Sequence, residues 1–259
     1  MRNFWTIFKK EIRLYFVSPI AYVVAGIFLV IMGYLFYVYL IAFSMQCVQS
    51  QSYGRLEAMQ NYLNLNNFVV SHFFGSMGFV MLLLLPLLTM RLFAEEKQQG
   101  TFELLFTSPI GNLELVLGKF AACFTVFAGM VGLTGIYHVL LVVFGNPDIH
   151  PIVTSYLGIL LLGAAFIAFG GLVSTFTQNQ VVAAALGFGG GMLFYVIGWL
   201  EHFMSGLSAR IFKLLSLVNH LDDFILGIIS TDHIVFYLSF IFLMLFLTGI
   251  SLESIRWRE

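Results

Sequence analysis

Six apolar stretches, each long enough to cross a bilayer, constrain the fold of this chain more than any other feature. A helix needs about 20 apolar residues to span a membrane. The stretches cover residues 20–43, 68–90, 120–144, 152–176, 180–200 and 234–252. Of the 259 residues 60% are hydrophobic and 10% charged, whereas a soluble domain is about 25% charged. The sequence therefore predicts an all-α integral membrane protein with six transmembrane helices.

The first 18 residues are amphipathic. Apolar side chains recur at helical spacing on one stripe, formed by Phe4, Phe8, Ile12 and Tyr15. The opposing stripe is polar and consists of Arg2, Thr6, Lys9 and Arg13. We expect residues 1–18 to form an interfacial helix in the membrane plane; the alternative is a basic flank that only sets topology. Residues 19–259 would then form one six-helix transmembrane domain.

The distribution of basic residues predicts the orientation. With six spans both ends lie on one side, and that side carries Arg2, Lys9, Lys10, Arg13, Arg91, Lys97, Lys119, Arg256 and Arg258. The other side carries only Arg55, Arg210 and Lys213. Because loops rich in Lys and Arg stay in the cytoplasm, both termini and the loop after the second span are expected there. The net charge of −1 gives no indication of nucleic-acid binding.

Gly187 and Gly191 form a G-x-x-x-G pair in the fifth span. Helices in lipid associate by close approach at small residues. The pair therefore predicts helix packing, either within the chain or between two protomers.

The densest cluster of charges follows the second span. Gly100 can end a first short helix there, because it tolerates the left-handed conformation of a helix C-terminus. Thr101 can then cap a new helix with Glu103 in its first turn, and Ser108-Pro109 would end it. Composition alone leaves two interpretations open: a helix that docks a partner, or a loop that is charged because water surrounds it.

The sequence pattern of this segment resembles a motif that is characteristic of one family of membrane transporters. Residues 95–109 read E-E-K-x-x-G-T-x-E-L-L-x-x-S-P and are followed by Glu114 and Gly118-Lys119. This run resembles that of ABC-2 type transporter permeases, in which it forms the coupling helix on the nucleotide-binding subunit. The resemblance covers nearly the whole chain and is nearest to the gliding-motility-associated group. It implies that the ATPase-coupling residues are Glu95, Glu96, Lys97, Gly100, Thr101, Phe102, Glu103, Leu104, Leu105, Ser108 and Pro109.

A second part of the resemblance precedes the last span. It rests on Ser216, His220, Phe224, Gly227 and Asp232. Similarity to type V ABC exporters implies that residues 201–233 form a pair of re-entrant helices, an external lid. Histidines and aspartates are frequent here, but their spacing fits no zinc pattern, so we expect helix caps or interfacial anchors and no metal site.

The resemblance implies a non-catalytic membrane subunit. The chain has no G-x-x-x-x-G-K-[ST] motif for ATP phosphates, so ATP and magnesium are expected in a separate ABC ATPase subunit. A second permease copy or a related transmembrane subunit would complete the translocation path in a bacterial inner membrane. A membrane-anchored auxiliary protein with a large external domain is a further expected partner. The subunit would couple ATP hydrolysis either to export of an unidentified substrate or to mechanical work on an extracytoplasmic partner.

Two other functions fit the sequence less well. An ATP-independent secondary carrier or channel usually needs ionisable residues within the bilayer, at about 2.5–3.5 kcal/mol each, and the six stretches have no Asp, Glu, Lys or Arg before their final residues. An intramembrane protease would need Glu95 and Glu96 as catalytic groups, but these lie at the membrane boundary without a suitable second group. The sequence therefore supports both of these functions less well than that of an ABC transporter subunit.

Overall fold

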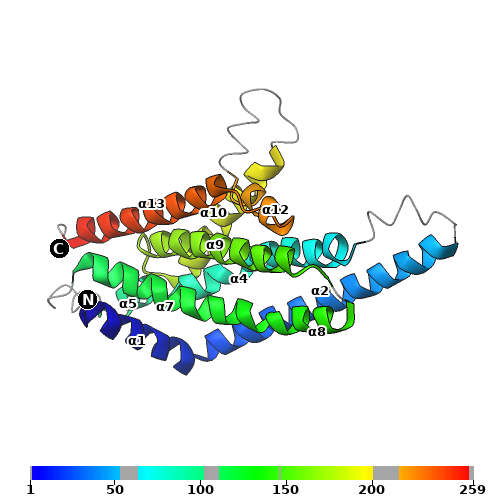
Figure 1. The fold of residues 1–259 in the computed structure, drawn as a ribbon. Coiled ribbons are helices and arrows are strands. Elements are labelled where there is room, and N and C mark those ends of the chain that lie inside the picture. The colour runs from blue at the N-terminus through cyan, green and yellow to red at the C-terminus, as the bar shows by residue number, and fades with distance from the viewer. Residues whose placement is uncertain (1, 53–63, 102–110, 146, 201–215, 257–259) are drawn as a thin grey trace.

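The computed structural model describes residues 2–52, 64–101, 111–145, 147–200 and 216–256, and these residues fold into helices without any strand. The longer helices run side by side as one bundle, with the two chain ends at the same end of it (Figure 1). They are α2 (Pro19–Ser52), α4 (Ser71–Thr89), α7 (Asn112–Leu133), α9 (Ile149–Ser174), α10 (Gln180–Leu200) and α13 (Thr231–Arg256). The shorter elements are α1 (Arg2–Val17), the π-helical turn η1 (Asn66–Val70), α5 (Ala94–Gln98), α8 (Gly135–Gly145) and α12 (Asn219–Ile225).

Six segments of the described chain are long and apolar enough to cross a membrane. They correspond to the six predicted stretches, so the prediction of an all-helical, multi-pass membrane protein is confirmed. The boundaries differ in places. The helix of the first span, α2, continues past Phe43 to Ser52. The third span begins with α7 at Asn112, ahead of the predicted start at Phe120.

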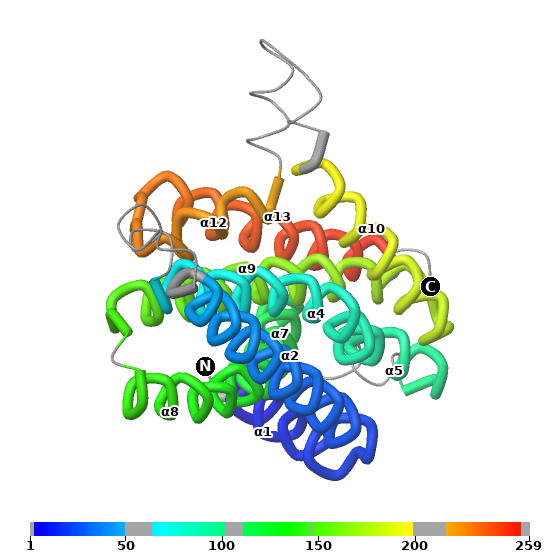
Figure 2. The backbone as a smooth tube through the Cα atoms, turned by 90° about the vertical axis from the view of Figure 1, so that its right-hand side faces the viewer, coloured from blue at the N-terminus to red at the C-terminus, as the bar shows by residue number. Residues whose placement is uncertain are grey.

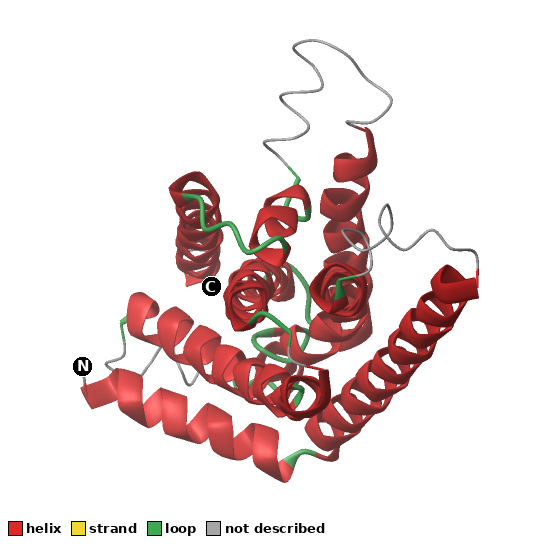
Figure 3. Ribbon diagram, turned by 45° about the vertical axis from the view of Figure 1, so that its right-hand side comes forward, coloured by secondary structure: helices red, strands yellow, loops and turns green. Residues whose placement is uncertain are grey.

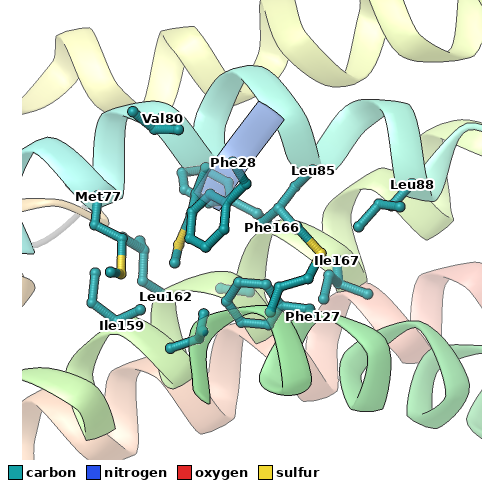
Figure 4. Packing of buried hydrophobic residues seen from close by; sticks show 14 of the residues in the cluster. Phe28, Met77, Val80, Leu85, Leu88, Phe127, Ile159, Leu162, Phe166 and Ile167 are labelled. Atoms are coloured by element: carbon teal, nitrogen blue, oxygen red, sulfur yellow. The ribbon is translucent and has the colours of Figure 1, made fainter. Parts of the chain in front are cut away.

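Helix α9 is the central element of the bundle (Figure 2). In its most apolar window 78% of the residues are buried, compared with 22% in α2 and α10 and 17% in α13. Its side chains Ile159, Leu162, Phe166 and Ile167 pack with Phe127 of α7 and with residues of α4 (Figure 4). The exposed apolar faces of the outer helices suit lipid contact, because hydrocarbon is as apolar as these side chains.

Glycines allow the helices to approach closely. A Cβ on Gly187 would lie 3.6 Å from Pro86 Cβ, and one on Gly191 would lie 2.7 Å from Leu82 Cδ1. Both glycines of the predicted G-x-x-x-G pair therefore lie where α10 packs against α4 of the same chain.

The third span is two helices, whereas the sequence predicted one uninterrupted stretch. The break falls at Thr134, whose hydroxyl donates to Val131 O at 2.6 Å and lies 3.1 Å from Tyr156 Oη. Thr side chains that bond nearby backbone compete with helical geometry. The apolar content of residues 120–144 does not reveal such a break.

Helix α1 packs along the first turns of α7 (Figure 3). Its buried stripe consists of Ile7, Glu11 and Tyr15. This differs from the predicted apolar stripe, of which only Tyr15 is buried, while Phe4, Phe8 and Ile12 are half-buried. The cause is the partner: α7 offers α1 a buried cation as well as apolar surface. The in-plane placement of α1 stays a prediction.

Candidate functional site at the charged end of the bundle

Helices α1 and α5, the start of α7 and the end of α9 meet at one end of the bundle, called here the charged end. Ser174, the last residue of α9, organises the start of α5. Its Oγ accepts hydrogen bonds from the N–H groups of Phe93 and Ala94 at 3.1 and 3.0 Å, and donates to Met90 O at 3.1 Å. The first N–H groups of a helix have no partner within it, so Ser174 satisfies α5 from outside. This fixes α5 to α9.

A buried ion network joins α1, α5 and α7. Lys119 Nζ of α7 lies 2.9 Å from Glu11 Oε1 of α1 and 3.1 Å from Glu96 Oε2 of α5. The side chains of Lys119, Glu11 and Glu96 are only 2%, 8% and 12% exposed. Because burying a charge without a partner is costly, the three side chains require one another. Lys10 adds a more exposed contact to Glu96 Oε1 at 3.4 Å.

Two further cations hold the segment before and within α5. Arg91 makes a two-pronged contact with Glu95, with Nε and Nη2 at 2.8 and 2.9 Å from the carboxylate oxygens. Its third nitrogen donates to Ser18 Oγ, at the junction of α1 and α2. Lys97 donates to the carbonyl of Thr175 just past the end of α9, where the helix dipole favours a cation.

Gly100 ends this first short helix with φ at +68°, as predicted. The N–H of Thr101 bonds back to Glu96 O at 3.1 Å, so the chain turns sharply there. The remaining predicted coupling residues lie outside the described residues, and the second short helix stays a prediction. They are Phe102, Glu103, Leu104, Leu105, Ser108 and Pro109.

A cavity of about 330 Å³ lies between α1 and α5. Three cations and three carboxylates line it, namely Lys10, Arg91, Lys119, Glu11, Glu95 and Glu96. Tyr15 also lines the cavity and donates to Leu88 O at 3.1 Å. Burial raises the pKa of the Tyr15 phenol well above its ordinary value, so this residue acts as a neutral hydrogen-bond donor.

At the other end of α9, residues of the predicted lid gather around α12. Thr154 of α9 donates to Phe224 O at 2.8 Å, and a Cβ on Gly158 would lie 2.7 Å from Phe224 Cβ. Ser216 Oγ accepts from the N–H of Asn219, and Ser216 O lies 2.7 Å from His220 Nδ1.

The chain leaves α12 through a turn and enters α13. Gly227 makes that turn with φ at +86°, and Asp232 lies in the first turn of α13. Residues 201–215, which include most of the first predicted re-entrant helix, lie outside the described residues. The pair of re-entrant helices therefore stays a prediction; within residues 216–233 the structure describes the short helix α12 and the start of α13.

Within the described chain no group of three or more His, Cys, Asp or Glu side chains could hold a metal ion. His233 Nε2 instead pairs with Asp223 Oδ2 at 2.6 Å, and His220 stacks on Phe236 with ring centroids 4.0 Å apart. These contacts are those of structural anchors.

Sequence reasoning missed Glu11 and Ser174. Glu11 carried a usable signal: it is the one acidic residue among the first 18, and it lies four residues from Ile7 and four from Tyr15, on the same face of a helix. A carboxylate on that face requires a buried cation. Ser174 carried no comparable signal, because a serine at a helix end is common.

The chain was compared with known families and proteins. The family described as "ABC-2 family transporter protein" matches residues 5–249, which is most of the chain. None of the curated proteins matches it.

Proposed function

Because this chain belongs to the ABC-2 transporter family, we propose that it couples ATP hydrolysis in a separate ATPase chain to work across the membrane. ABC-2 permeases are transmembrane subunits that work with an ABC ATPase partner. The observation that carries the proposal is the attachment of α5 to α1, α7, α9 and α10 at the charged end, directly before residues 102–109, which have the coupling-helix pattern. A segment that receives force needs such attachments to pass it on.

The proposed path of coupling runs through α9. Closure of two ATPase subunits would displace residues 95–109, and the Ser174 hydrogen bonds would pass that displacement to α9. Helix α9 has 26 residues, about 39 Å at 1.5 Å per residue, and its other end holds α12 through Thr154. One rigid helix thus connects the coupling segment to the lid. The ion network would carry the same displacement to α1 and α7.

The wider assembly is also part of the proposal. Basic residues at the charged end support a cytoplasmic position for it, in a bacterial inner membrane. A second copy or a related subunit would complete the path, and a membrane-anchored auxiliary protein with a large external domain would receive or deliver the cargo. The work done with such a partner would be either export of a substrate or mechanical work on the partner itself.

The coupling role predicts that Glu103→Arg sharply reduces co-purification of the ATPase chain with this one, because the substitution reverses the charge offered by the coupling helix. A pull-down from membranes of cells that express both chains would measure how much of the ATPase chain is recovered with this one. Glu253→Arg is the matched control, since Glu253 is an exposed acidic residue of α13 outside the segment. Equal ATPase recovery with both variants would count against the assignment.

The orientation predicts opposite labelling of two single cysteines in a background that carries Cys47→Ser and Cys123→Ala. Gln98→Cys lies at the exposed end of α5, and Leu226→Cys lies at the exposed end of α12. In sealed inside-out vesicles, an impermeant maleimide should label the first without permeabilisation and the second only after it. Labelling of both from one side would exclude the topology.

A further inference from the structure

The outer surface of α1 carries an open groove of about 510 Å³, lined by Lys9, Lys10, Arg13, Leu14 and Val17. Lys9 and Arg13 are exposed and pair with no acidic group among the described residues. Leu14 and Val17 follow them along the helix and are 52% and 71% exposed. The groove therefore has a cationic part and an apolar part.

The acidic residues nearest to this groove do not neutralise it. Glu11 is turned inward and bound to Lys119 on the opposite side of α1. Glu96 is shared between Lys119 and Lys10. Lys9 and Arg13 therefore keep their charge available to an external anion.

The apolar part of the groove lies next to the membrane entry. Val17 is the last residue of α1, and the first span begins at Pro19. A cationic patch that gives way to apolar side chains at this place matches a phosphate group above its acyl chains. A soluble anion would make no apolar contact with Leu14 and Val17. An acidic protein surface would likewise leave them uncovered on the membrane side.

We propose that this groove binds an anionic phospholipid, with the headgroup phosphate between Lys9 and Arg13 and an acyl chain along Leu14 and Val17. Basic side chains next to a membrane attract acidic lipids, and here the helix also offers a shaped apolar surface. The inference does not depend on the ATPase, because it concerns only this chain and its lipid.

Trp5 provides the probe, since it is 57% exposed and lies one helical turn before Lys9. The full chain with Trp199→Phe and Trp257→Phe would be placed in nanodiscs of phosphatidylcholine that contain a small fraction of either brominated phosphatidylglycerol or brominated phosphatidylcholine. Bromine quenches tryptophan at contact. We expect brominated phosphatidylglycerol to quench Trp5 more strongly than brominated phosphatidylcholine does. This difference should decrease as added salt screens the charges.

The paired variant Lys9→Gln/Arg13→Gln should weaken the preference for phosphatidylglycerol roughly tenfold or more. The matched control Lys9→Arg/Arg13→Lys conserves charge and should retain it. Circular dichroism and elution volume would establish that both variants fold.

Equal quenching by the two lipids in the unaltered chain would overturn the proposal. So would an undiminished preference in the glutamine variant. If that variant keeps its lipid preference and loses the ATPase in a pull-down, the surface is a protein contact and the lipid assignment is wrong. Loss of lipid preference with ATPase binding intact would support the lipid site independently of the coupling role.

Discussion

Lys119→Met is expected to lower the free energy of unfolding by about 3–5 kcal/mol, the usual cost of leaving a buried charge without its partner. Lys119 is 2% exposed and is the only cation within 4 Å of Glu11 among the described residues. Methionine fills a similar volume, so the loss would be mainly electrostatic. Equilibrium unfolding in mixed micelles would measure it.

Lys10→Met is the matched control, because it removes the same charge from the same network at a site that is 54% exposed. Exposed ion pairs contribute about 0–1 kcal/mol, so its effect should be several-fold smaller. Equal losses from Lys10→Met and Lys119→Met would refute the assignment of a buried network.

Glu11→Gln in the Lys119→Met background tests the cause of the loss. The amide removes the stranded negative charge, so the double variant should recover part of the lost stability. Residues that share one network deviate from additivity by about 0.5–3 kcal/mol. Strict additivity of the two substitutions would show that Lys119 acts through packing alone.

The number of membrane-spanning segments and their helical type could be predicted from the sequence, because lipid requires long apolar helices with internally bonded backbones. Their ends could not. Helix α2 continues past Phe43 to Ser52 through polar residues, since backbone hydrogen bonding does not stop where lipid contact does. The break at Thr134 combines a local hydrogen bond to Val131 O with a contact to Tyr156 of another helix, and the apolar pattern of the span encodes neither.

For the candidate site, charge density located the segment but not its attachments. Glu11 and Lys119 are 108 positions apart in sequence, and periodicity within one helix cannot pair them. Gly100 was different, because a left-handed turn is a local requirement that a glycine meets on its own. Contacts within a few residues were therefore predictable, whereas those between helices needed the fold.

Among the described glycines, Gly163 would bring a new Cβ nearest to a neighbouring atom, so the other large effect is expected from Gly163→Ala. A Cβ on Gly163 would lie 2.2 Å from Phe127 Cζ and 2.3 Å from Cε1. Phe127 is 1% exposed and is enclosed by side chains of α9 and its neighbours (Figure 4), so its ring has no room to withdraw. Overpacking of a filled core costs about 1–3 kcal/mol and occasionally more.

Gly129→Ala is the matched control. Gly129 lies on α7, like Phe127, and a Cβ there would meet no atom within 4 Å. Replacing an exposed helical glycine by alanine gains about 0.5–1 kcal/mol from backbone entropy. The two alanine variants should therefore shift the unfolding temperature in opposite directions in a thermal scan.

Phe127→Leu in the Gly163→Ala background tests whether the clash itself is responsible. A smaller side chain would leave space for the new methyl group, so the double variant should lose less stability than the sum of the two single substitutions. Gly163 lies on α9 between Thr154 and Ser174, the residues that hold α12 and α5. A displaced α9 would therefore also weaken the coupling proposed above, and under that proposal the substrate-dependent ATPase activity of the complex with the ATPase chain should fall with Gly163→Ala and recover with the added Phe127→Leu.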